Sequence, residues 1–255
     1  MHPAIFVSHG SPTLPLDDVP ARDFLRGLGA KLGTPKAILV ASAHWETGAP
    51  ALNAVERNGT IHDFYGFPAP LYDLHYSAPG APALAERVSS LLAAVGLQAH
   101  IDTARGLDHG AWVPLMLMYP NADIPVLQIS VQSHAGAGHH IALGRTLAPL
   151  RQEGVLILGS GGFVHNLRTI DWDGGPEPEW SRAFASWMHE KLLARDEAAL
   201  ADYRNLAPQA KQAHPTEEHL VPLMVAYGAG GEKVERLHSS VTLSSLRMDA
   251  YRFGD

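Results

Sequence analysis

The chain has 255 residues, of which 46% are hydrophobic and 18% are charged, and its formal net charge is −7 at pH 7. This balance excludes a disordered chain, and the negative charge argues against a surface that binds nucleic acid or anionic membranes. The sequence has no cysteine, which excludes disulfides and thiolate metal ligands and is typical of a reducing cytoplasm.

Strand-like and helix-like segments alternate along the chain. In chain order, apolar runs and amphipathic patterns predict strands at 4–8 and 37–42, a helix at 81–96, a strand at 124–131, a helix at 139–154, a strand at 154–160, and helices at 178–196 and 216–231. The tail, residues 241–253, is predicted to add an edge strand. This order predicts an α/β fold, a three-layer α/β/α sandwich with a mostly parallel or mixed central sheet.

No linker, repeat or low-complexity segment interrupts the pattern, so we expect residues 1–255 to form one catalytic domain. The first residues lack the features of a signal peptide, and no apolar run reaches the roughly 20 residues that span a bilayer. We therefore expect a cytoplasmic protein.

The 15 histidines are the unusual feature of the composition, and five of them share a context. His9 follows the first predicted strand in FVSHGSP, His44 ends the second in ASAHWET, and His165 follows the fourth in GSGGFVHNL. His109 lies at a helix start in GLDHGAWVPL, and His219 lies in the first turn of the last predicted helix, which Thr216 is expected to cap.

In an open α/β sheet the functional crevice lies beyond the carboxyl ends of the strands. His9, His44 and His165 are therefore expected to converge there. Neutral imidazole is the commonest metal ligand, so three or four histidines at one edge of the sheet predict a metal site.

Other residues carry weaker signals. His62 and His75 flank an aromatic loop that could equally wall a pocket or pack on the core, and Trp45 and Trp112 are expected to pack beside the site. The segment GSGG at 159–162 lacks the full dinucleotide fingerprint, and there is no nucleophile elbow. Seven histidines are expected on the surface or on helix faces: His2, His100, His134, His139, His140, His189 and His238.

Taken together, the motifs resemble those of the class III extradiol ring-cleaving dioxygenases, in the branch called 4,5-DOPA dioxygenase extradiol. They occur in the order and spacing of that family: FVSHGSP, ASAHWET, IHDFYGFP, DHGAWVPL, GSGGFVHNLR and PTEEHLVPL. The resemblance implies that His9, His44 and His219 are metal ligands and that His165 is the acid–base histidine. It also implies that His109 touches substrate or oxygen, and that His109 and His165 bind the substrate. Some relatives use two histidines and one carboxylate, whereas the third ligand position is His219 in this chain.

The implied reaction is the opening of a small, DOPA-like catechol by O₂, with one divalent metal ion per chain and with no nucleic acid or membrane partner. Fe²⁺ is expected for activity, because the metal must pass electron density from the catecholate to O₂. Zn²⁺ is expected in the purified protein, because nitrogen-rich sites generally bind Zn²⁺ more tightly than Fe²⁺.

Two other classes of protein remain open at this point. A zinc hydrolase would use the same three histidines, with Glu46 or Glu218 as the base for a metal-bound water. A catalytically silent metal-binding protein could also keep this fold, because fold does not determine function.

Overall fold

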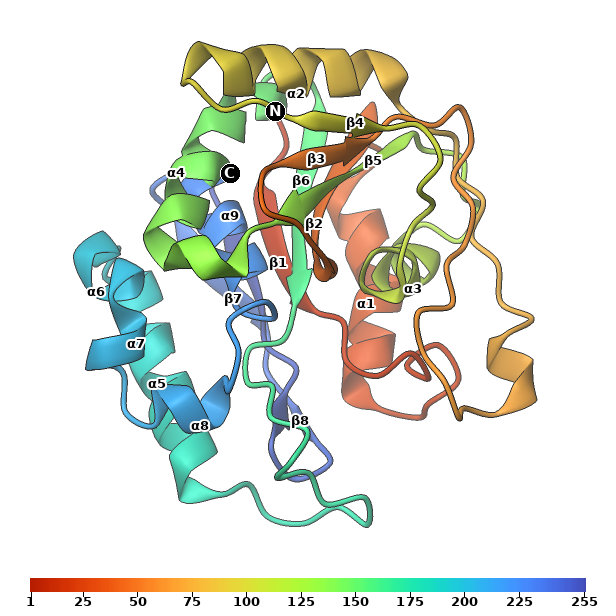
Figure 1. Ribbon diagram of the computed structural model, residues 1–255. Coiled ribbons are helices and arrows are strands. Elements are labelled where there is room, and N and C mark those ends of the chain that lie inside the picture. The colour runs from red at the N-terminus through yellow and green to blue at the C-terminus, as the bar shows by residue number, and fades with distance from the viewer.

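A mixed eight-stranded sheet forms the centre of the protein (Figure 1), and the computed structural model describes residues 1–255. In the order β4-β3-β5-β2-β6-β1-β10-β7, the sheet contains β1 (Ala4–Ser8), β2 (Ala37–Glu46), β3 (Ala51–Asn53), β4 (His100–Asp102), β5 (Val126–Val131), β6 (Val155–Gly161), β7 (Val234–His238) and β10 (Ala250–Phe253). The four central strands β5, β2, β6 and β1 are parallel to one another. A separate two-stranded ribbon contains β8 (Val241–Thr242) and β9 (Leu246–Arg247).

Helices cover both faces of this sheet, which confirms the three-layer α/β/α architecture (Figure 1). On one face, Phe6 and Leu39 pack with α2 (Pro82–Ala94), α4 (Gly136–Leu147), α5 (Glu179–Leu193) and α9 (Val221–Ala229). On the other face, Ile5 and Ile38 pack with α1 (Pro20–Leu32) and α3 (His109–Met118). Neighbouring residues of one strand thus enter opposite layers, which is why these strands are continuously apolar.

The remaining elements are short. Three helices follow α5, namely α6 (Glu197–Ala201), α7 (Tyr203–Leu206) and α8 (Ala210–Ala213), and 3₁₀ turns lie at Ala69–Leu71, Ser133–Ala135 and Ala148–Arg151. None of the helices has both the length and the apolar character needed to cross a membrane.

Two predicted elements differ from the structure at the C-terminal side of the chain. The tail does contribute a strand, β10, but its prediction as an edge strand is wrong, because β10 pairs antiparallel with β1 on one side and β7 on the other. Tyr251 and Phe253 are fully buried in this interior position.

The predicted helix at 216–231 begins only at Val221. Thr216 does not cap a helix; its hydroxyl donates to Glu218 Oε1 at 3.0 Å. The carbonyl of His219 instead accepts the N–H of Gly162 at 2.8 Å, which ties the turn before α9 to the end of β6. His219 therefore lies in a turn and not in the first turn of a helix.

His140, expected on the surface or on a helix face, lies on α4, where it is fully buried. Its Nδ1 bonds the Gly136 carbonyl at 2.8 Å, and its Nε2 accepts the backbone N–H of Gln132 at 3.1 Å. It thereby links α4 to the end of β5, a structural role that its helical spacing did not indicate.

Candidate metal and substrate site

Five histidine rings converge at the carboxyl ends of the central strands. His9 follows β1, His44 lies near the end of β2, His165 follows β6, His109 begins α3, and His219 precedes α9. The His9 ring centroid lies 4.9 Å from that of His44 and 5.5 Å from that of His219. Because β2, β6 and β1 are neighbours in the sheet, residues far apart in the chain meet at this edge.

Local packing around His44 depends on glycine and on a buried carboxylate. A Cβ on Gly110 would collide with the Ser42 hydroxyl and would come within 2.9 Å of the His44 ring. Asp108 is fully buried and caps α3, accepting the N–H of Ala111 at 3.2 Å and the Ser42 hydroxyl at 2.6 Å. These contacts hold the start of α3 against β2.

The hydrogen bonds of His9 determine which ring nitrogen faces the site. Its Nδ1 lies 3.1 Å from Ser160 Oγ, and the Ser160 hydroxyl donates to the carbonyl of Gly110. A hydroxyl that has donated its proton can only accept, so His9 Nδ1 carries the proton and His9 Nε2 presents a lone pair. That Nε2 lies 3.0 Å from Nε2 of His44.

Asp63 connects two of the site histidines, and the sequence reasoning did not single it out. Its Oδ2 accepts from Nδ1 of His109 at 2.9 Å and lies 3.6 Å from Nδ1 of His44, while its Oδ1 accepts the backbone N–H of His109 at 2.9 Å. Burial alone would raise the pKa of Asp63, but the hydrogen bonds and charge of His109 outweigh it and lower that pKa to about 2. Asp63 is therefore a carboxylate at neutral pH.

On the opposite side of the site, His165 stacks on His219, with ring centroids 3.5 Å apart and planes 8° from parallel. Nδ1 of His219 lies 2.9 Å from Glu218 Oε1, so this nitrogen donates to the carboxylate and Nε2 is left with a lone pair. His214 lies outside this group, because its Nε2 donates to the carbonyl of Phe163 at 3.0 Å.

Burial keeps the imidazoles of His9, His44, His165 and His219 neutral. It lowers the pKa values of His9 and His219 well below the ordinary value, and the neighbouring histidines lower them further. The pKa of His44 falls to about 4 through burial and the charge of His109, and burial likewise lowers the pKa of His165 to about 4. Neutral imidazole is the form that binds a metal.

The donor set fits a divalent metal ion. One nitrogen each of His9, His44 and His219 lies within 4.8 Å of the others. The 3.0 Å between the first two matches two imidazoles on one ion at metal–nitrogen distances of about 2.1 Å. The outer nitrogens of His44 and His219 face Asp63 and Glu218, the carboxylate–histidine pairing common around bound metals.

The five histidines form one end of a pocket with a volume of about 350 Å³. Its other walls are mostly apolar and include Phe64, Phe67, Leu167, Ile170, Trp172 and Leu243. Phe64 and Phe67 belong to the aromatic loop between His62 and His75, and Phe64 also packs into the core. Both open interpretations of that loop thus hold in part, and the pocket is large enough for a substituted aromatic ring.

This arrangement, an open metal-binding group beside an apolar pocket, agrees with the known proteins that the chain resembles. The family model described as "Catalytic LigB subunit of aromatic ring-opening dioxygenase" matches residues 3–254. The chain belongs to this family. It is thus an extradiol ring-cleaving dioxygenase, as the sequence motifs predicted, and enzymes of this LigB family depend on a metal.

Named LigB-family relatives are similar over almost their whole length. The chain is 50% identical over 255 residues to the 4,5-DOPA dioxygenase extradiol of Beta vulgaris, covering 97% of this chain and 95% of that one. It is 40% identical over 258 residues to the Escherichia coli K12 protein of the same name, covering 99% and 94%. It also superposes with a TM-score of 0.82 on the crystal structure of uncharacterized protein JW3007 from Escherichia coli K12, at 34% identity and with 100% of both chains covered.

The other residues that the sequence singled out lie around this LigB-type site. Trp45 is buried beneath the guanidinium of Arg105, and the Trp112 indole donates to the carbonyl of Ile61 at 2.9 Å. Glu46 is exposed, bonds Ser133 and does not line the pocket, so it is not placed to act as a base there. A Cβ on Gly161 would collide with the carbonyl of His219 and one on Gly159 with the carbonyl of Pro222, which explains these two glycines of GSGG by packing.

Proposed function

We propose that the protein cleaves the ring of a small DOPA-like catechol, using His9, His44 and His219 to hold a divalent metal ion. The observation that carries this proposal is the convergence of three buried imidazoles on one end of an apolar pocket, with one nitrogen of each within 4.8 Å of the others. Support for the substrate comes from the names of relatives that are 50% and 40% identical.

An ion held by His9, His44 and His219 would supply a binding point for the catechol and a route for electron density from the ring to O₂. His165 accepts a proton from a catechol hydroxyl and returns it to the substrate as the ring opens. Proton transfer of this kind typically contributes about 10²–10⁴-fold in rate. The apolar walls around Phe64 and Phe67 hold the ring and limit the access of water.

His109, a different residue from the proton-transferring His165, contacts the substrate or oxygen in the pocket. Because Nδ1 of His109 donates to Asp63, its Nε2 is available to accept a hydrogen bond from a bound group. We assign to Asp63 the role of fixing this tautomer and the ring orientation of His109.

Fe²⁺ is the metal we expect to support turnover, and Zn²⁺ the metal we expect in protein purified in air. Zinc has no accessible redox change, whereas a set of nitrogen ligands favours zinc over ferrous iron. Asp63 and Glu218, bonded to the outer edges of the site histidines, would offset the positive charge of either ion.

We also propose that residues 1–255 act as one catalytic domain, since strands from the two ends of the chain, β1 and β10, pair side by side. A cytoplasmic location, suggested by the cysteine-free composition, completes the proposal.

Oxygen consumption tests the function directly. The protein is stripped of metal, loaded anaerobically with Fe²⁺, mixed with a panel of catechols and then exposed to air. Stoichiometric O₂ uptake with a yellow ring-opened product is expected. Hydrolysis of esters or amides by the zinc form alone, with no O₂ uptake by the iron form, would instead indicate a hydrolase.

A further inference from the structure

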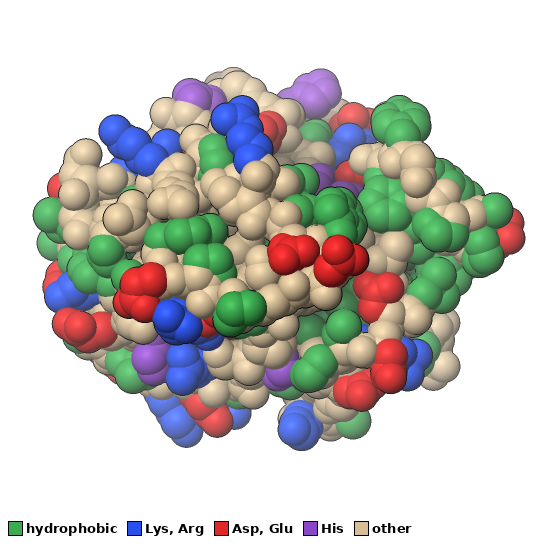
Figure 2. Space-filling model, turned by 90° about the horizontal axis from the view of Figure 1, so that it is seen from below, with side chains coloured by type: hydrophobic (Ala, Val, Ile, Leu, Met, Phe, Trp, Pro, Cys, Tyr) green, Lys and Arg blue, Asp and Glu red, His purple; other side chains and the backbone are tan.

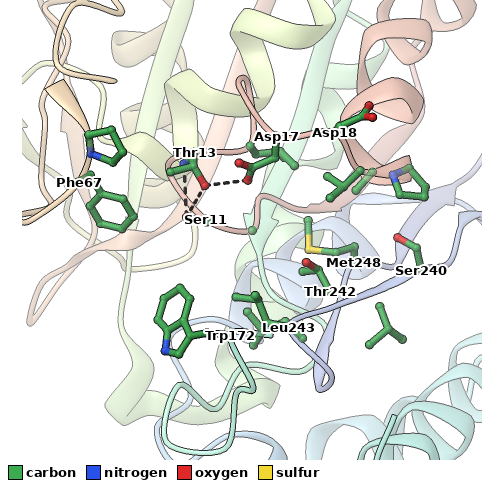
Figure 3. A pocket seen from close by; sticks show the side chains of 18 of the residues that line it. Ser11, Thr13, Asp17, Asp18, Phe67, Trp172, Ser240, Thr242, Leu243 and Met248 are labelled. Carbon is green, nitrogen blue, oxygen red and sulfur yellow. Dashed lines mark hydrogen bonds between the residues drawn. The ribbon is translucent and has the colours of Figure 1, made fainter. Parts of the chain in front are cut away.

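A second, larger cavity lies beside the catalytic pocket. Its volume is about 840 Å³, compared with about 350 Å³ for the pocket that the histidines line. Both spaces are lined by Gly10, Ser11, Phe67, Trp172, Leu243 and Leu246, so the two lie next to each other. The outer cavity, whose lining Figure 3 shows, therefore offers space for a side arm of a catechol held at the histidines.

The only charged side chains that line the outer cavity are acidic. No lysine or arginine lines either space, and the only acidic residues that do so are Asp17 and Asp18. Asp18 is 96% exposed and pairs with Arg22 at 2.8 Å. Asp17 forms no ion pair, which leaves it as the one carboxylate there without a cationic partner. Figure 2 shows acidic and basic side chains distributed over this face, with acidic ones also near its middle.

Asp17 is held in position and lies close to the catalytic pocket. The Thr13 hydroxyl donates to Asp17 Oδ2 at 2.7 Å and lies 3.0 Å from Ser11 Oγ (Figure 3). Ser11 lines both spaces and follows His9 by two residues. Two consecutive hydrogen bonds thus connect the carboxylate to the rim of the catalytic pocket.

Aromatic side chains add a second feature that favours a cation. Tyr65, Phe67 and Trp172 line the outer cavity, and Tyr65 and Trp172 are 91% and 74% exposed. The face of an aromatic ring attracts an ammonium group. A carboxylate without an ion pair and exposed aromatic rings thus line one cavity that has no basic residue in its lining, which is the environment expected around a bound amine and not around a bound carboxylate.

We propose that the outer cavity binds the side arm of the substrate and that Asp17 recognises an ammonium group on that arm. This inference rests on the proposed catechol dioxygenase function and names its substrate class as catechols with an amine-bearing arm. The carboxylate of a DOPA-like arm finds no cationic partner along the lining and adds little to recognition.

Three catechols that differ in the charge of the arm test the proposal: DOPA, dopamine and dihydroxyphenylpropionic acid. With the iron-loaded enzyme, O₂ uptake should give a kcat/KM up to about fivefold higher for the two amines than for the acid, the range expected for one partly solvated ion pair. Asp17→Asn should remove this preference, mainly by raising KM for the amines, and added salt should weaken it.

Asp23→Asn is the matched control, because it also replaces one aspartate by asparagine. Asp23 lies on α1, its side chain is 64% exposed, and it lines neither space. The inference is overturned if wild-type enzyme prefers the acid or shows no preference, or if Asp17→Asn lowers kcat/KM equally for all three catechols. The ratios of kcat/KM among the three catechols, measured with the wild-type enzyme, can overturn the inference by themselves. The test therefore does not depend on whether the Asp17→Asn variant folds. A complete lack of O₂ uptake, with unsubstituted catechol included, would instead reject the dioxygenase function itself.

Discussion

Replacement of Asp63 by asparagine should slow turnover without removing the pocket. The native carboxylate accepts two hydrogen bonds from His109, one from the backbone N–H and one from ring Nδ1–H, each at 2.9 Å. Asparagine has the same size but only one acceptor oxygen. If that oxygen stays with the backbone N–H, the amide NH₂ faces Nδ1, and the ring proton of His109 must move to Nε2, where it points into the pocket.

The expected loss follows from this exchange. A hydrogen bond to a charged group contributes about 1.5–3 kcal/mol, and replacing a partner of a metal-site histidine typically costs about 10–100-fold in activity or metal affinity. We therefore expect kcat for Asp63→Asn to fall roughly 10- to 100-fold. Metal retention should weaken less, because Asp63 Oδ2 lies farther from Nδ1 of His44, at 3.6 Å.

The assay combines O₂ uptake by the iron-loaded variant, metal content per chain, and ¹⁵N chemical shifts of the His109 ring in the zinc-loaded form. Asp73→Asn, an exposed change in the same loop, is the control and should behave like the wild type. Wild-type turnover by Asp63→Asn, or a ring proton that stays on Nδ1, would refute the positioning role. Complete loss of metal would make Asp63 part of the metal-binding set.

The other predictions concern the remaining site residues, the metal and pH. His165→Ala should keep the metal but lose at least about 100-fold in kcat, because its role is proton transfer; a variant without metal would make His165 a ligand. His219→Ala should lose the metal, whereas His214→Gln, which can still donate to the carbonyl of Phe163, should keep it, and metal analysis giving the reverse would reassign the third ligand. Protein purified in air should carry mostly zinc, and anaerobic exchange to Fe²⁺, but not to Zn²⁺, should restore O₂ uptake. Metal-free protein should lose stability as pH falls from about 6.5 towards 4, because burial lowers the pKa values of His44, His140 and His165 to about 4 while the unfolded chain takes up protons from about 6.5 downwards. Urea unfolding measured across this pH range checks the last point, and a flat profile would contradict it.

The sequence by itself determined the layered architecture and the edge of the sheet at which the site lies. Continuous apolar segments such as 37–42 predicted strands covered on both faces, and β2 is buried in that way. His9 and His44 come at strand ends before residues that turn or leave the sheet, so their convergence followed from the rule that parallel strands end at one edge. The six motifs then indicated the family, because each carries its chemistry within a few consecutive residues.

Tertiary structure alone decided which residues support that site. Asp63 is 46 positions from His109, and Ser160 is 151 positions from His9, so no local periodicity relates them. The interior position of β10 likewise depends on its pairing with β7, not on the pattern of the tail. Strand order, and the turn that brings His219 to the end of β6, are selected by the packing of whole layers against each other. A hydrogen bond across such a junction depends on how the distant segments meet, and the residue pattern of either segment alone does not contain that information.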